Sequence, residues 1–299
     1  MKSRWLAVFV TLAGLGILAR RAGLVESLRA RGEIETRDEW ERLGESPDGS
    51  ERYPPQGMAF AGGSLYVTNH WNGRKSELYH IDPESGAVMA SATMPPEATH
   101  TSGLTWADGT LWAVDHTSNV LYRLDAETTF IDGDAAIEER YNTGLRGSSG
   151  LTAMRIDGVD HVAVSDFVWT IETTVPLPLG TGRTFIAPLS DVRSGQTVRE
   201  AATVAYDNGG YSQGLTWDGE YLYESANNFG IDRIEVVDVT RAVERNDSSA
   251  IRHRGSFEGP ANRIEDIGTD GSRCWTTDEG TYSLYRLEGL DEIRDQVTD

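Results

Sequence analysis

Residues 56–70 read QGMAFAGGSLYVTNH, and this phrase of an apolar run, a tight turn and a second apolar run returns four more times. The other copies are SGLTWADGTLWAVDH at 102–116, SGLTAMRIDGVDHVAVSDF at 149–167, QGLTWDGEYLYESANN at 213–228 and EDIGTDGSRCWTTDE at 265–279. Successive copies start 46 to 64 residues apart, a period that suits a four-stranded propeller blade and exceeds a leucine-rich or ankyrin unit. The sequence therefore predicts an all-β, five-bladed β-propeller.

Each copy is expected to form a β-hairpin, because its turn residues adopt positive φ at little cost. The turns are Gly62-Gly63, Asp108-Gly109, Asp157-Gly158, Asp218-Gly219 and Asp270-Gly271. Alternating apolar residues predict third strands at Glu77–Asp82, Val120–Asp125, Thr184–Leu189, Arg233–Asp238 and Ser283–Leu287. More polar fourth strands are expected at Ala87–Met94, Ala136–Asn142, Gln196–Val204 and Ala250–Phe257.

The fifth copy has no fourth strand after it in the sequence. The segment Glu33–Leu43 (EIETRDEWERL) lies before the first copy and is predicted to pair with the last blade. Such pairing would close the ring with an N-terminal strand and remove an exposed sheet edge. The additional length between the third and fourth copies lies mostly in Val168–Arg183, which is rich in Pro, Gly and Thr and is expected to be a projecting loop.

The first 24 residues differ from the rest of the chain. Basic residues flank the apolar run Trp5–Ala19, which as a helix would reach about 22 Å against a hydrocarbon core of ~30 Å. We expect residues 1–24 to form an N-terminal hydrophobic helix that is a signal anchor or a cleaved signal peptide, with a buried helix as the third reading. Residues 25–299 are expected to form a single propeller domain, at the cell surface or secreted, with membrane contact through the N-terminal segment.

Charge excludes some partners. The chain carries 47 acidic and 27 basic side chains, a formal net charge of −20, which repels nucleic acid and anionic lipid. An acid-rich, lysine-poor composition resembles that of proteins from salt-loving archaea, in which carboxylates keep the surface hydrated. The single cysteine, Cys274, excludes an intrachain disulfide and a zinc site of several thiolates.

A binding site is expected where the hairpins meet the central channel, because the start of each first strand and the end of each second strand lie at the same end of the hairpin. The strand starts contribute Gln56, Ser102, Ser149, Gln213 and Glu265, and the strand ends contribute Asn69, His70, Asp115, His116, Asp166, Asn227, Asp278 and Glu279. This polar, acidic mouth suits a peptide or small-molecule ligand. The alternative for each residue is a local role in its turn.

Glu224 stands out among the second strands. When the second strands of the five copies are aligned, the position of Glu224 is occupied by Val67, Ala113, Val164 and Thr276 in the other copies. Only the fourth copy therefore places a carboxyl there. A period-two strand puts this column on the face that carries apolar residues two positions earlier. A desolvated acid at this place would have a raised pKa suited to proton transfer, whereas the alternative is a glutamate that reaches solvent at the rim.

The segment 211–230, YSQGLTWDGEYLYESANNFG, resembles the opening motif of plant and bacterial glutaminyl-peptide cyclotransferases. That family motif has an aromatic residue, T-Q-G-L, a turn and L-Y/F-E-S-T-G before an aromatic-Gly pair, and Ala226 and Asn227 stand where the family has Thr and Gly. The resemblance implies a secreted five-bladed propeller without a catalytic metal, in which Glu224 is the essential glutamate and Gln213 the motif glutamine. It also implies cyclisation of an N-terminal glutamine with loss of ammonia. The substrate-binding residues expected on this reading are Gln213, Asn227, His70, His116, Trp71 and Gln56.

Two other functions stay open. In a lactonase-like hydrolase, Asn69, Asp115, Asp166 and Asp278 would supply oxygen ligands to Ca²⁺ or Mg²⁺. In a non-catalytic cell-surface module, the mouth would hold a peptide or sugar, with aromatic residues nearby at Trp71, Phe167, Trp169 and Phe229. A Ser-nucleophile elbow and a phosphate-binding loop are excluded, since neither G-x-S-x-G nor G-x-x-x-x-G-K occurs.

Overall fold

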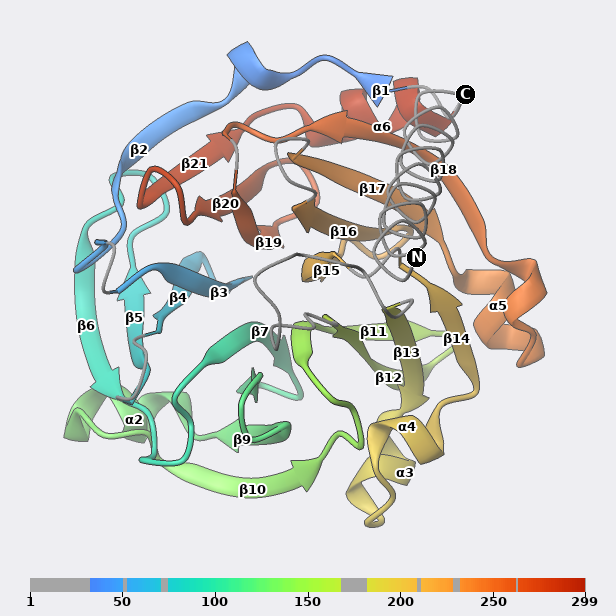
Figure 1. Ribbon diagram of the computed structural model, residues 1–299, viewed down its shortest axis with the longest axis horizontal. Coiled ribbons are helices and arrows are strands. Elements are labelled where there is room, and N and C mark those ends of the chain that lie inside the picture. Colours follow the sequence, from blue (N-terminus) through green and yellow to red (C-terminus); the bar gives the residue numbers. More distant parts are fainter. Residues whose placement is uncertain are drawn as a thin grey trace, which may run out of the picture.

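Five β-sheets stand around a common axis in the computed structural model (Figure 1). The structure describes residues 33–50, 53–70, 75–167, 182–208, 211–227, 232–261 and 263–298. The innermost strands of neighbouring sheets contact one another around the whole ring. The predicted five-bladed all-β propeller is therefore confirmed.

Each blade contains four antiparallel strands, which are given below in order from the axis outward. Blade one holds β3 (Pro55–Ala61), β4 (Ser64–Asn69), β5 (Glu77–Ile81) and β6 (Val88–Thr93). Blade two holds β7 (Thr101–Ala107), β8 (Thr110–Asp115), β9 (Val120–Leu124) and β10 (Ile137–Asn142). Blade three holds β11 (Ser148–Ile156), β12 (Val159–Asp166), β13 (Arg183–Pro188) and β14 (Val204–Asp207). Blade four holds β15 (Ser212–Trp217), β16 (Leu222–Asn227), β17 (Asp232–Asp238) and β18 (Arg252–Glu258).

Blade five holds β19 (Ile264–Thr269), β20 (Cys274–Asp278) and β21 (Ser283–Leu287), and its outer strand is β2 (Glu41–Glu45). β2 pairs antiparallel with β21, with Glu41 opposite Arg286. The strand differs from the segment expected from the sequence, because Arg37–Glu39 form a short 3-10 helix, η1. The two residues of β1 (Glu33–Ile34) pair in parallel with β18 of blade four instead. Residues 1–32 lie outside the described part of the chain, and so does the expected N-terminal helix.

The hairpin turns follow two patterns. At Gly62-Gly63, Asp108-Gly109 and Asp157-Gly158 both residues have positive φ, as a two-residue hairpin turn requires. In blades four and five only the glycine has positive φ, and the loop is longer because the preceding aspartate accepts N–H bonds from the following residues. The sequence prediction of five equivalent tight turns was wrong for these two blades.

Short helices lie between the outer strands and at the C-terminus. They are α2 (Ala126–Asp132), α3 (Leu189–Arg193), α4 (Val198–Ala201), α5 (Thr240–Arg245), the 3-10 helix η2 (Ser248–Ala250) and α6 (Leu290–Thr298). The predicted strand Gln196–Val204 was wrong, because a capping box between Thr197 and Glu200 starts α4 and the fourth strand begins only at Val204. No helix of the described residues is both long and apolar enough to cross a membrane.

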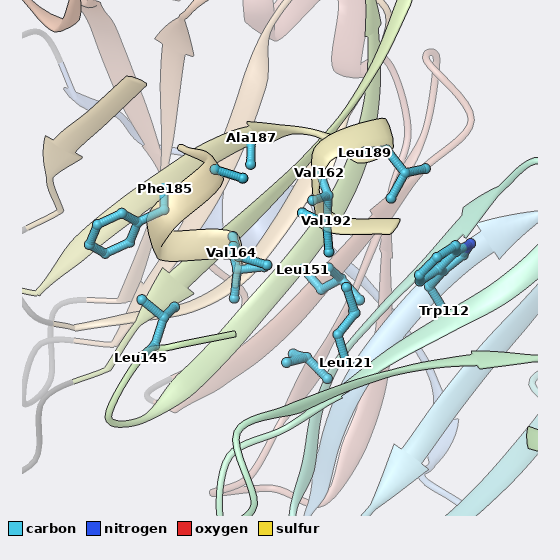
Figure 2. Close-up of a cluster of buried hydrophobic side chains, with 13 residues drawn as sticks. Trp112, Leu121, Leu145, Leu151, Val162, Val164, Phe185, Ala187, Leu189 and Val192 are labelled. Carbon is cyan, nitrogen blue, oxygen red and sulfur yellow. The ribbon is translucent and has the colours of Figure 1, made fainter. Parts of the chain in front are cut away.

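Five buried hydrophobic clusters hold the ring together, one between each pair of neighbouring blades. The cluster in Figure 2 joins Trp112 and Leu121 of blade two to Val162 and Val164 of blade three, with Leu189 of α3 covering it. Successive side chains of a strand point to opposite faces of the sheet, so each blade packs one face against the preceding blade and the other face against the following blade. The core is thus radial, and the axis itself is polar.

A circuit of hydrogen bonds links each blade to the next near the axis. In every case a buried Ser or Thr hydroxyl donates to a backbone carbonyl oxygen of the following blade. The pairs are Thr68 with Thr101, Ser102 with Ser148, Ser149 with Ser212, Ser225 with Glu265, and Thr277 with Gln56. The last pair returns from blade five to blade one, so the circuit is complete.

Asp266 bridges four blades across the axis. Its Oδ2 accepts the backbone N–H of Met58 at 2.8 Å and of Leu104 at 3.2 Å, and its Oδ1 accepts those of Leu215 at 3.1 Å and Ile267 at 2.9 Å. These donors belong to blades one, two, four and five. Complete burial raises the pKa of the Asp266 carboxyl, while the four N–H donors lower it.

Glycine stands in the place of Asp266 in the other four copies. The positions are Gly57, Gly103, Gly150 and Gly214. A Cβ on Gly214 would lie 2.1 Å from Oδ1 of Asp266, and one on Gly103 would lie 2.4 Å from the carbonyl oxygen of Ser149. The axis therefore has room for one side chain at this level, and blade five supplies it.

Candidate functional site

The mouth of the channel has one residue from each blade at an equivalent place. In each blade a residue at the end of the second strand, the last one in blade four and the next one in the other blades, donates its backbone N–H to a carbonyl just before the first strand of the same blade. These residues are His70, His116, Phe167, Asn227 and Glu279. The first strand of each blade also has a β-bulge near its start, where its register with the second strand shifts. Such a bulge changes the direction of the side chains near the mouth.

Three histidines gather at the mouth above blades one and two. The rings of His70 and His100 stack with centroids 3.8 Å apart, and His116 lies 4.9 Å from His100. Nε2 of His100 is 2.6 Å from Oε1 of Gln56. Burial lowers the pKa of all three imidazoles, so they are neutral at pH 7. The structure thus brings together Gln56, His70 and His116, which the sequence had singled out.

His100 joins this group although sequence analysis missed it. It lies two residues before the second copy of the repeat, outside the motif. Its backbone N–H donates to Oδ2 of Asp115 at 2.6 Å, which holds it against the end of β8. The signal in the sequence was the place of His100 directly before the first strand of blade two, at the same end of the sheet as His70 and His116.

An acidic group lies at the mouth beside blade five. Glu265 is 3% exposed, and its carboxyl contacts that of Glu279. Burial raises the pKa of Glu265 well above its ordinary value, and the charge of Glu279 adds to this effect. The carboxyl of Glu265 therefore holds its proton more tightly than that of an exposed glutamate. Burial also raises the pKa of Asp232, at the start of β17, to about 7.

Glu224 lies between blades three and four, apart from the histidines and the Glu265 and Glu279 carboxyls at the mouth. It is 3% exposed, and its carboxylate accepts hydrogen bonds from the Tyr206 hydroxyl at 2.9 Å and the Thr184 hydroxyl at 3.1 Å. Nδ2 of Asn208 donates to the Thr184 oxygen at 3.2 Å and continues this network to a half-buried side chain. Burial raises the pKa of Glu224 to about 7, while the surrounding hydroxyls lower it. At neutral pH this carboxyl is poised to accept or donate a proton.

The candidate metal ligands occupy equivalent strand ends in four different blades. Asp115 accepts the N–H of His100 and Ser118, Asp166 accepts that of Gly147, and Asp278 accepts those of Arg263 and Thr281. Asn69 contacts Ser46 and the carbonyl of Pro47. Within the described ranges, no group of three His, Cys, Asp or Glu residues is arranged to hold a metal ion.

The remaining candidates are divided between the described and undescribed residues. Gln213 and Asn227 are half-buried at the mouth end of blade four. Phe167 faces His116 with ring centroids 6.2 Å apart. Trp71, Trp169 and Phe229 lie outside the described residues.

The fold and mouth define a five-bladed propeller whose polar axial face gathers imidazoles and carboxyls. A protein-family profile described as a repeat of unknown function (DUF6923) matches residues 33–144, fewer than half of the chain. No curated protein matches the sequence.

Two solved structures are similar to this chain. The crystal structure of Myxococcus xanthus glutaminyl cyclase is similar with a TM-score of 0.55 and 14% identity, over 83% of this chain and 94% of that chain. A chain of the nidogen/laminin complex is similar with a TM-score of 0.47 and 15% identity, over 79% of this chain and 76% of that one. At 14% identity the first likeness shows the fold alone.

Proposed function

We propose that this propeller is a glutaminyl-peptide cyclotransferase-like enzyme that forms N-terminal pyroglutamate, with Glu224 as its general acid and base. The carrying observation is the buried carboxyl of Glu224, whose pKa of about 7 matches the needs of proton transfer at neutral pH. Glu224 also lies in the segment 211–230 that resembles this family. The fold shared with a bacterial glutaminyl cyclase is compatible with the proposal.

The reaction balances with one acid/base group. The α-amine nitrogen of the substrate attacks the carbon of its own side-chain amide, a C–N bond forms and closes the five-membered ring, and the amide C–N bond breaks. The carboxylate of Glu224 takes the proton that the attacking nitrogen loses and delivers it to the departing nitrogen, which leaves as ammonia. Tyr206 and Thr184 orient this carboxyl through their hydroxyls.

On this proposal, the substrate amide reaches Glu224 from the mouth, between the ends of blades three and four. Thr184 and Ser212 both stand near the mouth end of their strands, β13 and β15. Asn208, which is half-buried next to Thr184, supplies a polar contact at this entrance. On this proposal, Gln213 and Asn227 bind the peptide at the adjacent rim, with Trp71 and the group of Gln56, His70 and His116 as further binding residues.

A direct assay is ammonia release from a Gln-initiated peptide in concentrated salt. We expect turnover by the wild type, and a loss of about 100-fold or more in Glu224→Gln, which keeps the side-chain shape and removes the titratable proton. Glu77→Gln is a matched control, because burial also raises the pKa of Glu77 but this residue lies in blade one. Failure of well-folded wild type to release ammonia above the uncatalysed rate would overturn the proposal.

A second candidate is a non-catalytic ligand-binding propeller. The stacked rings of His70 and His100, with Phe167 beyond His116, favour it, since they offer flat aromatic surface at a polar mouth. The lactonase-like alternative with Ca²⁺ gains less support, because the carboxylates of Asp115 and Asp278 each accept two or more hydrogen bonds from their own loops. Unchanged ammonia release in excess chelator would separate the cyclase from this metal enzyme.

We also propose a place for the enzyme. The basic residues around the apolar run Trp5–Ala19 support an N-terminal helix that anchors the propeller outside the cytoplasm or directs its secretion. The net charge of −20 supports function in concentrated salt. β2, bound to β21 of the last blade, would then close the ring directly after the anchor.

A further inference from the structure

The acidic group beside blade five is not used by the proposed reaction. It consists of Glu265, Glu279, Asp278 and Asp232, which lie near enough for their charges to raise the pKa of Glu265. Glu224 lies on the other side of β16 from this acidic group. Its carboxylate accepts a hydrogen bond from the Thr184 hydroxyl of blade three, whereas the hydroxyl of the next residue, Ser225, donates to the backbone carbonyl of Glu265 in blade five. The two groups of carboxyls therefore lie on opposite faces of β16.

One of these carboxyls is buried with an oxygen that no donor satisfies. Oε1 of Glu265 has no hydrogen-bond partner among the described residues, although the residue is only 3% exposed. Asp278 differs, because the backbone N–H groups of Arg263 and Thr281 bind its carboxylate at 2.7 and 2.6 Å. Buried polar atoms are nearly always paired in folded proteins, so the free oxygen of Glu265 calls for a donor that the described residues do not supply.

The nearby positive charges do not fill this role for Glu265. Arg37 and Arg263 act electrostatically on Asp232, and lower its pKa, but they are not among the groups that most affect Glu265. His70, the neighbour of Glu279, is neutral at pH 7 because burial lowers its pKa. Among the described residues, the blade-five side of the mouth thus has acceptors in excess, and no positive charge is among the groups that most affect Glu265.

A ligand that carries its own N–H donors fits this arrangement better than a metal ion. The described residues hold no group of three His, Cys, Asp or Glu side chains at metal-binding geometry. A primary ammonium brings three donors and one positive charge, which suits two carboxyls in contact whose oxygens outnumber the donors around them. Glu279 is half-buried at the rim of the mouth, so a ligand would contact Glu279 first and then the more deeply buried Glu265.

We propose that Glu265 and Glu279 form a binding site for a primary ammonium group, such as that of a lysine side chain or an amine. The site goes beyond the proposed cyclase chemistry and does not depend on it. The ammonium donates to Oε1 of Glu265 and to Glu279, with Asp232 adding negative charge nearby.

Calorimetric titration of the full chain at constant salt tests this site with three probes: n-butylammonium, tetramethylammonium and Ca²⁺. We expect n-butylammonium to bind, and tetramethylammonium, which has no N–H, to bind about 10-fold more weakly. Glu265→Gln and Glu279→Gln should each weaken n-butylammonium binding about 10-fold. Glu77→Gln, in blade one, should leave it unchanged.

The outcomes separate the possibilities. Equal affinity for the two ammonium ions, tighter binding of Ca²⁺ than of n-butylammonium, or unchanged binding in both glutamine variants would each overturn the proposal. Should Glu265→Gln fail to fold, Glu279→Gln at the half-buried rim decides alone. Loss of cyclase activity in any variant has no bearing on this result, because the titration requires no turnover.

Discussion

Replacing Asp266 by glycine would make the fifth copy of the repeat like the other four. The change leaves the backbone N–H groups of Met58, Leu104, Leu215 and Ile267 without their acceptor. Each unsatisfied buried donor costs about 1–3 kcal/mol. The loss is offset in part because a carboxyl no longer has to be buried, which itself costs several kcal/mol. We expect a net destabilisation of about 3–5 kcal/mol, the range for removal of one partner from a buried charged network.

Guanidinium unfolding at fixed salt measures this effect, and hydrogen exchange at the four N–H groups locates it. Asp115→Gly is the matched control for Asp266→Gly, because Asp115 is equally buried but its partners His100 and Ser118 belong to its own blade. We expect the smaller loss at Asp115, since that substitution does not affect contacts between blades. If Asp266→Gly unfolds at the same guanidinium concentration as the wild type, the four-blade bridge is not a source of stability.

Three further predictions concern the ends and the buried acid. Deletion of residues 1–44 should lower the melting temperature well below that of a chain lacking only residues 1–24, because β21 loses its partner strand; equal melting would contradict this. The full chain should sediment with membranes and the chain lacking residues 1–24 should not, as fractionation can show. Folded Glu224 keeps its proton to about pH 7 and the unfolded side chain only to about 4.5, so stability should fall as pH rises between these values. Glu224→Gln should flatten this fall by about 3 kcal/mol in denaturation curves measured from pH 4 to 8.

The blades were predictable because each repeats the same local signals. Alternating apolar residues and turn glycines determine the hairpins, and the third strand Ser283–Leu287 was predicted with its observed limits. The outer strand of blade three was not predictable in this way, since the cap formed by Thr197 and Glu200 outweighs a weak alternation. Outer strands are polar and partly exposed, so the hydrophobic pattern that locates inner strands is weak there.

The site was predictable only as far as antiparallel geometry reaches. That geometry places His70, His116 and Gln56 near one mouth, but the contact through His100 depends on a loop whose path the repeat does not determine. Glu224 was singled out by its column, and its burial against Tyr206 involves a strand of the preceding blade. Asp266 was missed although the signal was present, as one aspartate in a column of four glycines.

The circuit of hydroxyl-to-carbonyl bonds has a consequence for cleaved forms of the protein. Every blade donates to one neighbour and accepts from the other, so no blade is terminal in this layer. A protease cut in an outer loop leaves both fragments joined by two such contacts, by two of the radial hydrophobic clusters and, for most cuts, by Asp266. Two separately produced fragments, divided between blades two and three, should therefore reassemble when mixed, with Thr277 and Ser102 restoring the two links that cross the division.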